Sequence, residues 1–295
     1  MRTPDPERPA GPTRPDSTIG RRDLTRWPTR TGRTVVAAVD RVVDHLGPLG
    51  RWGRDNLALV VTVLAGAVVV LVLDVLAAQV YEAVTEQDGL AGLDRPVLDA
   101  AVALRTPARD TAVTAFTDLG GTIGMPILVL VVTGVLVALR RSWTPVVVMV
   151  VAAAGSLLMT VLGKDLVGRA RPPATLAVPP LETSPSFPSG HTLNATVLVG
   201  ALAYLLLLAA RHTWQRVLVA AVATAFVLAM GLSRVFLGHH WLTDVVAGWL
   251  LGLGWLAAVV TGHRVRLTLG RQPDATTARP ASSRATGTRN GEQDT

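Results

Sequence analysis

Long apolar segments separated by short polar ones dominate the middle of the chain, and both ends are polar. Residues 1–56 are rich in Pro, Arg, Thr and Asp and contain no apolar run. Residues 57–80 are almost wholly Leu, Val and Ala, and Asp74 is their only charged residue. Because roughly 20 apolar residues span the ~30 Å hydrocarbon core of a bilayer, residues 57–80 predict a membrane helix.

Five further apolar segments of similar character predict five more membrane helices. They cover residues 122–139, 143–162, 192–210, 217–232 and 241–262. The pattern therefore predicts an all-α fold, a six-transmembrane-helix bundle within residues 57–262. Residues 1–56 are predicted to be a partly disordered Arg/Pro-rich tail, and residues 263–295 a disordered tail.

The composition supports a membrane protein. Hydrophobic residues make up 49% of the chain, charged residues 17%, and the mean hydropathy is +0.41. These values are too apolar for an ordinary soluble domain or a disordered chain. The absence of Cys excludes disulfide scaffolds, thiol nucleophiles and zinc ribbons.

The net charge of +7 and the pI of about 11.1 would also suit a nucleic-acid-binding protein. The placement of the basic residues argues otherwise. Twenty-one of the twenty-eight lie in the two tails or in the turns after the second and fourth spans, which an even number of spans puts on one side. Cytoplasmic loops carry such an excess. We therefore expect both termini to be cytoplasmic and no nucleic-acid partner.

Four basic residues break this rule, because they lie at the outer ends of the third and fifth spans. They are Lys164, the only lysine of the chain, Arg169, Arg171 and Arg234. Lys164 and Arg171 are seven residues apart, so in a continuing helix they would project from one side and could bind one anion. Arg169 lies off that side, and we expect it to contact lipid headgroups.

A second polar segment, Ser-Phe-Pro-Ser-Gly-His, opens the fourth span at residues 186–191. Ser189 could simply cap this helix. Gly190 leaves its backbone N–H open, and N–H groups at a helix N-terminus form an anion site. His191 beside it would be a suitable acid or base, because its ordinary pKa lies near neutrality.

A third segment, residues 233–244, joins the fifth and sixth spans. His240 and Asp244 are four residues apart, so on a helix the carboxylate could hold one ring nitrogen and leave the other basic. Such a pair is usually a surface salt bridge, but here it lies at the mouth of a membrane span, where charge is costly. His240 is thus a candidate nucleophile. We expect His239, on another face, to have a minor or interfacial role.

All three segments are predicted to emerge on one face, because the 41 residues between His191 and Ser233 allow one span inward and one back. Together they describe a cationic pocket with two His, one Asp, one Ser and a helix N-terminus. This set suits a phosphoryl group.

These residues carry a resemblance to a known family. Lys-x6-Arg-Pro, Pro-Ser-Gly-His and Ser-Arg-x5-His-x3-Asp occur in that order, as in the three-part signature of the type 2 phosphatidic acid phosphatase family, which is itself similar to vanadium haloperoxidases and acid phosphatases. Every signature position matches, and the six-span region fits the membrane-bound form. The two tails are not covered.

The resemblance implies a role for each residue. His240 would attack phosphorus to form a phosphohistidine, Asp244 would orient it, and His191 would protonate the leaving oxygen and later activate water. The phosphoryl oxygens would be held by Lys164, Arg171, Ser189, Gly190 and Arg234. No metal and no other cofactor is implied.

The sequence thus predicts a membrane lipid phosphatase with an extracytoplasmic site. Candidate substrates are polyprenyl diphosphate, which we favour slightly, phosphatidic acid and phosphatidylglycerol phosphate; membrane lipids are the other expected partners. Two alternatives stay open: a phosphotransferase using the same phosphohistidine, and a non-catalytic lipid-binding or transport protein. Oligomeric state is not predicted. We expect Asp74 to make a structural hydrogen bond, and Gly248, Gly252 and Gly254 to permit close helix packing.

Overall fold

The computed structural model describes residues 18–19, 22–23 and 56–269. Two short strands, β1 (Thr18–Ile19) and β2 (Arg22–Asp23), pair antiparallel. The predicted tails lie outside the described residues, apart from these strands and from residues 56 and 263–269. From residue 56 to residue 269 the secondary structure is entirely helical.

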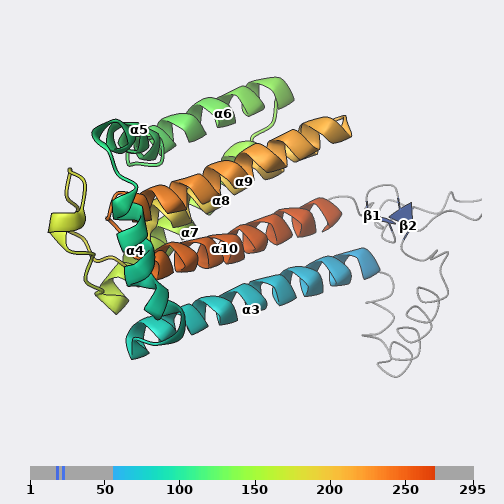
Figure 1. Ribbon diagram of the computed structural model, residues 1–295. Coiled ribbons are helices and arrows are strands. Elements are labelled where there is room, and N and C mark those ends of the chain that lie inside the picture. The colour runs from blue at the N-terminus through green and yellow to red at the C-terminus, as the bar shows by residue number, and fades with distance from the viewer. Residues whose placement is uncertain (1–17, 20–21, 24–55, 270–295) are drawn as a thin grey trace, which may run out of the picture.

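Six long helices form the bundle, and short helices connect them at one end (Figure 1). The long helices are α3 (Leu57–Glu86), α6 (Gly124–Arg140), α7 (Thr144–Val167), α8 (Gly190–Ala209), α9 (Thr213–Phe236) and α10 (Leu242–Leu269). The short elements are η2 (Gly89–Leu93), α4 (Asp94–Ala103), α5 (Pro107–Asp118) and η3 (Ala174–Leu176). In Figure 1 the long helices run roughly parallel, with α4 and α5 across one end.

Five of the long helices in the described part of the chain are long and apolar enough to cross a membrane: α3, α7, α8, α9 and α10. The predicted span 122–139 corresponds to α6, a shorter apolar helix of 17 residues. Helix α10 continues to Leu269, beyond the boundary that hydropathy suggested at residue 262.

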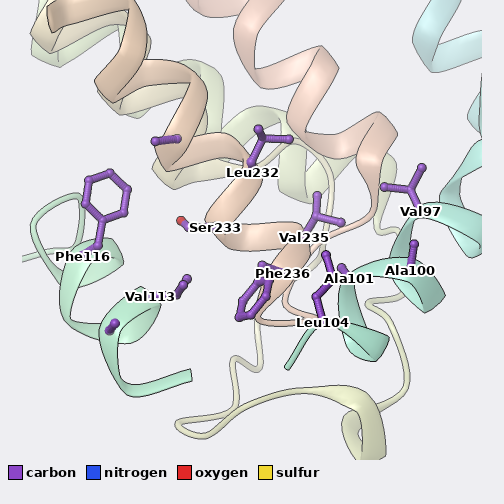
Figure 2. A pocket seen from close by; sticks show the side chains of 12 residues that line it. Val97, Ala100, Ala101, Leu104, Val113, Phe116, Leu232, Ser233, Val235 and Phe236 are labelled. Atoms are coloured by element: carbon purple, nitrogen blue, oxygen red, sulfur yellow. The ribbon is translucent and has the colours of Figure 1, made fainter. Parts of the chain in front are cut away.

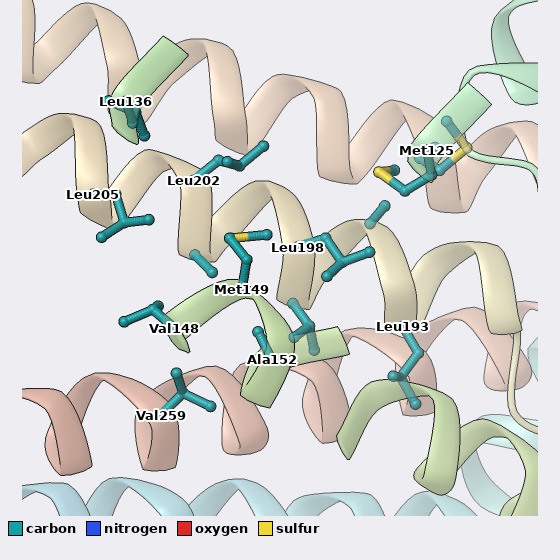
Figure 3. Packing of buried hydrophobic residues seen from close by; sticks show 14 residues of the cluster. Met125, Leu136, Val148, Met149, Ala152, Leu193, Leu198, Leu202, Leu205 and Val259 are labelled. Atoms are coloured by element: carbon teal, nitrogen blue, oxygen red, sulfur yellow. The ribbon is translucent and has the colours of Figure 1, made fainter. Parts of the chain in front are cut away.

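Helix α8 lies in the middle of the bundle and packs against α6, α7, α9 and α10. Its side chains, among them Leu198, Leu202 and Leu205, form a core with Met149 of α7 and Val259 of α10 (Figure 3). This position explains why α8 shows no apolar stripe: a helix surrounded by others is apolar on all sides.

The outward faces of the other long helices carry large apolar side chains. Leu71 of α3, Leu130 of α6 and Leu157 of α7 are each more than 60% exposed. So many exposed aliphatic side chains would be unfavourable in water, whereas lipid chains are as apolar as they are. The protein is a multi-pass membrane protein.

Glycines of α10 bring two neighbouring helices close, as the sequence predicted. Gly248 and Gly252 face Thr192 and Thr196 of α8, and Gly254 faces Asp74 of α3. The hydrogen bond expected for Asp74 is not formed within the described residues, so that prediction was wrong. Its carboxylate lies against a glycine, which has no side chain to donate a proton, in a helix whose N–H groups are already bonded internally.

Candidate active site

The three predicted segments meet at the end of the bundle that α4 and α5 cover (Figure 1). They are the end of α7 with the loop after it, the start of α8, and the last turn of α9 with the loop after it and the first turn of α10. All eight predicted site residues lie in these segments.

His240 and Asp244 are both buried and face each other. His240 is 1% exposed and Asp244 0%. Nδ1 of His240 lies 3.3 Å from Oδ2 of Asp244, and the same oxygen accepts hydrogen bonds from the hydroxyl of Ser186 and the backbone N–H of Trp241 (2.9 Å). The carboxylate is thus held by several donors.

Arg171 determines whether the other ring nitrogen of His240, Nε2, donates or accepts. Nη1 of Arg171 lies 3.1 Å from Nε2 of His240. Because a guanidinium only donates, Nε2 must accept, which leaves the ring proton on Nδ1, facing Asp244. Burial, outweighing the attraction of Asp244, lowers the pKa of His240 from 6.5 to about 4, so the ring is neutral at pH 7. Nε2 therefore carries the lone pair of the ring, which here accepts from Arg171.

The His240–Asp244 pair arises differently from the helical spacing that predicted it. Helix α10 begins at Leu242, so His240 precedes it. The backbone N–H groups of His239 and His240 both donate to the carbonyl of Arg234 (3.0 and 3.2 Å), which folds this loop back over the end of α9. The pair is therefore a loop residue facing the first turn of a helix.

Lys164 and Arg171 converge because the chain turns, rather than because a helix continues. Helix α7 ends at Val167, and Gly168 takes a left-handed conformation with φ of 60°. Lys164 donates to the hydroxyl of Ser184 (3.1 Å) and to the carbonyl of Pro185, and Arg171 donates to the same two groups (3.1 and 3.4 Å). Residues 182–185 thus bind both cations.

Lys164, Arg171 and Arg234 form a cation cluster, and Glu182 adds a carboxylate to it. The sequence reasoning missed Glu182. It pairs with Arg171 (2.7 Å) and with Arg234. Burial alone would raise the pKa of Glu182, but Arg234, Arg171, His240 and His191 together outweigh it and lower the pKa well below 4.5. A signal did exist: Glu182 is the only charged residue between positions 172 and 188.

Arg234 is almost fully buried, with 2% of its side chain exposed. Its Nη1 donates to the hydroxyl of Thr117 in α5 (3.2 Å), a residue the sequence did not single out. Its Nε is buried and has no hydrogen-bond partner among the described residues. Arg234 therefore keeps a donor available inside the cluster.

The start of α8 lies between Asp244 and the α5–α6 turn. Ser189 is fully buried; its N–H donates to the carbonyl of Asp244 (3.1 Å), and its hydroxyl accepts from Thr192 rather than capping a backbone N–H. Gly190 is the first residue of α8. The Nε2 of His191 lies beside Gly121, 3.7 Å from where a Cβ on that glycine would stand.

Two expectations about neighbouring residues were wrong. Arg169, expected at lipid headgroups, forms buried ion pairs with Asp94 (2.7 Å) and Asp244 (2.6 Å), because the turn at Gly168 directs it inward. His239, expected to be minor or interfacial, does not lie at the interface: it is 6% exposed, and its Nε2 lies 2.7 Å from the carbonyl oxygen of Val178. It is buried because the loop between α9 and α10 folds back over α9 and carries His239 and His240 into the protein interior.

An apolar cavity of about 620 Å³ lies beside the cluster, between α4, α5 and α9. Figure 2 shows Val97, Leu104, Phe116 and Phe236 around it. Ser233 also lines it, and the hydroxyl of Ser233 donates to Thr117, which contacts Arg234. The hydroxyl of Thr117 thus links Ser233, in the cavity lining, to the Arg234 guanidinium.

Comparison with known proteins identifies the family. The profile of the PAP2 superfamily matches residues 144–267, which include all eight predicted site residues. Phosphatidylglycerophosphatase B of Bacillus subtilis is 32% identical over 164 residues, 54% of this chain and 78% of that protein. The chain belongs to the PAP2 superfamily.

Further PAP2 relatives agree with this assignment. The crystal structure of a transmembrane PAP2-type phosphatidylglycerolphosphate phosphatase from Bacillus subtilis matches with a TM-score of 0.58 and 28% identity, over 66% of this chain and 95% of that one. An undecaprenyl-diphosphatase of Sulfolobus acidocaldarius is 32% identical over 130 residues, 43% of this chain and 58% of that protein. These three relatives are named as phosphatases of lipid phosphates, whereas other matched relatives are named glucose-6-phosphatase 3.

Proposed function

We propose that this PAP2 protein hydrolyses a phosphomonoester or diphosphate lipid through a phosphohistidine on His240. The observation that carries the proposal is the Glu182 carboxylate, held by Arg171 and Arg234. The cluster already accommodates an oxyanion, next to a neutral histidine whose Nε2 lone pair accepts from Arg171, one of the cations assigned to the phosphoryl group. A phosphoryl group offers more oxygens and more charge to the same donors.

The chemistry follows from the geometry of His240. Its Nε2 forms a bond to phosphorus while the bond from phosphorus to the leaving oxygen of the lipid breaks. His191, protonated in the substrate complex where the charge of the phosphoryl group offsets that of Arg234, gives its proton to that oxygen. Asp244 stabilises the positive charge that then develops on the His240 ring through Nδ1–H. The cations Lys164, Arg171 and Arg234 offset the charge on the phosphoryl oxygens.

A water molecule completes the cycle. It attacks phosphorus as His191 removes one of its protons, and the bond between phosphorus and Nε2 breaks with its electron pair returning to nitrogen. Inorganic phosphate leaves, and both histidines regain their starting states. Ser189 and the backbone N–H of Gly190 are assigned to the phosphoryl oxygens, at the positive end of the α8 dipole.

The membrane arrangement proposed for this reaction has six spans, with α6 as the short one, since 17 residues is near the minimum for a span. Both termini are cytoplasmic and the active site is extracytoplasmic. The substrate is a polyprenyl diphosphate, phosphatidic acid or phosphatidylglycerol phosphate. The apolar cavity beside Arg234 offers its hydrocarbon chain a suitable environment.

The test is phosphate release by the purified full chain in detergent. The three lipid classes are supplied with and without EDTA, to wild type and to His240→Ala, with His212→Ala, an exposed histidine before α9, as the matched control. We expect release that is insensitive to EDTA, unchanged in His212→Ala, and lower by several orders of magnitude in His240→Ala.

Trapping the phosphoenzyme tests the nucleophile, and the reaction products distinguish a phosphatase from a phosphotransferase or a binding protein. An acid-labile, alkali-stable phosphoenzyme should form in wild type and not in His240→Ala. Activity that survives in His240→Ala would refute the nucleophile. Transfer of the phosphoryl group to an added acceptor alcohol, without release of inorganic phosphate, would indicate a phosphotransferase. No turnover with any lipid would favour a binding or transport protein.

A further inference from the structure

We propose that Arg169 and Asp94 are positioning residues for Asp244, acting on His240 through that carboxylate. The proposal rests on the proposed function for its effect on turnover. Neither residue lies at a signature position of the family, and they come from different segments: Arg169 follows α7, whereas Asp94 begins α4.

Arg169 bridges two buried carboxylates. Its Nη1 donates to Oδ1 of Asp244 (2.6 Å), and its Nη2 donates to Oδ2 of Asp94 (2.7 Å). The three side chains are 12%, 0% and 7% exposed, respectively. A planar guanidinium can bind one carboxylate with each terminal nitrogen, which the single nitrogen of a lysine cannot do in the same geometry.

Asp94 anchors the start of α10. Its Oδ1 accepts from the backbone N–H of Thr243 (2.9 Å), and its Oδ2 accepts from the Thr243 hydroxyl (2.7 Å). The first N–H groups of a helix have no partner within the helix, and a carboxylate there also suits the helix dipole. Asp94 thus caps α10 from another element, one residue before Asp244.

The two oxygens of Asp244 have separate partners. Oδ1 is held by Arg169, and Oδ2 accepts from Ser186 and Trp241 and faces His240. The carbonyl of Arg169 also accepts from the N–H of Ser186 (2.8 Å), so Arg169 helps to place the serine as well. Without Arg169, Oδ1 would be a buried charge with its strongest partner removed, and the carboxylate would turn away from Nδ1 of His240.

This arrangement predicts a specific kinetic effect. Misplacing Asp244 impairs His240 in the transition state, whereas Lys164, Arg171 and Arg234, which hold the phosphoryl group, are bound by residues 182–185. We expect Arg169→Gln to lower kcat by tenfold or more, within the limit of about 10⁴ known for a misdirected triad histidine, and to leave KM within about twofold.

The experiment compares Arg169→Gln, Asp94→Asn and the double variant. If the two residues act as one unit, the double variant should be no slower than the slower single variant. Arg169→Lys should recover part of the loss. The matched controls are Arg95→Gln and Asp99→Asn, an exposed ion pair on α4, which should match wild type.

Hydrogen exchange gives a readout that does not depend on turnover. Amides of residues 241–245 should exchange faster in Arg169→Gln and Asp94→Asn than in wild type or the controls. Unchanged exchange and kcat, a rise in KM alone, or additive losses in the double variant would overturn the proposal. An inactive wild type with the expected exchange pattern would instead refute the proposed function and leave the positioning role supported.

Discussion

The Glu182 carboxylate accepts from the guanidinium of Arg171 across 2.7 Å, in the cation cluster assigned to the phosphoryl group. It also pairs with Arg234. A phosphoryl group can therefore bind these two arginines fully only after Glu182 has given up at least one of them. The carboxylate and the substrate compete for the same donors.

Glu182→Gln should bind phosphate more tightly, because a neutral amide competes less well than a carboxylate for guanidinium groups. We expect the inhibition constant of inorganic phosphate, measured by initial rates, to fall by about tenfold, the equivalent of about 1.4 kcal/mol. Glu86→Gln, an exposed residue at the end of α3, is the control. Weaker inhibition in Glu182→Gln would show that the carboxylate supports the site instead of competing for it.

Lys164→Arg should impair turnover although it keeps the positive charge. Nζ of Lys164 donates to Ser184 and Pro185 as a compact point charge. The same two acceptors already bind the Arg171 guanidinium, so a second planar fork at position 164 would crowd them. Lys164→Ala should cost roughly 10²–10³ in kcat, as for the loss of one oxyanion donor, and Lys164→Arg should fall between it and wild type. Full activity of Lys164→Arg in the phosphate-release assay would contradict this.

Activity should persist to lower pH than an ordinary histidine nucleophile allows. Burial lowers the pKa of His240 to about 4, so its neutral, nucleophilic form predominates above that pH and is lost as the pH falls through it. The acid limb of kcat/KM should therefore lie near pH 4 rather than 6.5. The profile is measured with a diphosphate lipid whose own ionisation is titrated separately by ³¹P NMR. An acid limb near 6.5 after that correction would contradict the burial effect.

The cavity of Figure 2 can be filled from α4. Ala101 lines it, whereas Ala103 on the same helix is exposed and lies outside its lining. Ala101→Trp should raise KM for a long-chain polyprenyl diphosphate by about tenfold, the equivalent of about two buried methylene groups, and leave a short-chain analogue unaffected. Ala103→Trp is the control. An equal rise for both chain lengths would place the hydrocarbon chain elsewhere.

Sidedness can be tested with single cysteines, since the chain has none of its own. Thr183 lies beside Glu182, at the active-site end of the bundle. Thr213 begins α9, at the other end of the bundle. Each is replaced by Cys in turn. A membrane-impermeant maleimide applied to intact cells should label the first and not the second. The reverse labelling would invert the proposed orientation.

The membrane helices and the signature residues could be predicted from the sequence alone. Span formation depends on local hydropathy, because about 20 apolar residues favour the bilayer whatever their neighbours are. The motifs containing His191, His240 and Asp244 carry their chemistry in their residue types. Their meeting on one face followed from counting the spans.

Only the tertiary structure decided how the site is held together. Arg169 pairs with Asp94 and Asp244, each 75 residues away, and Asp94 caps α10 across 149 residues. Whether a charged residue near a membrane faces lipid or the interior depends on where a helix ends, and the turn at Gly168 reversed the expectation for Arg169. Residue types and spacing define which groups can react, whereas loop paths and distant partners define the direction in which each group points.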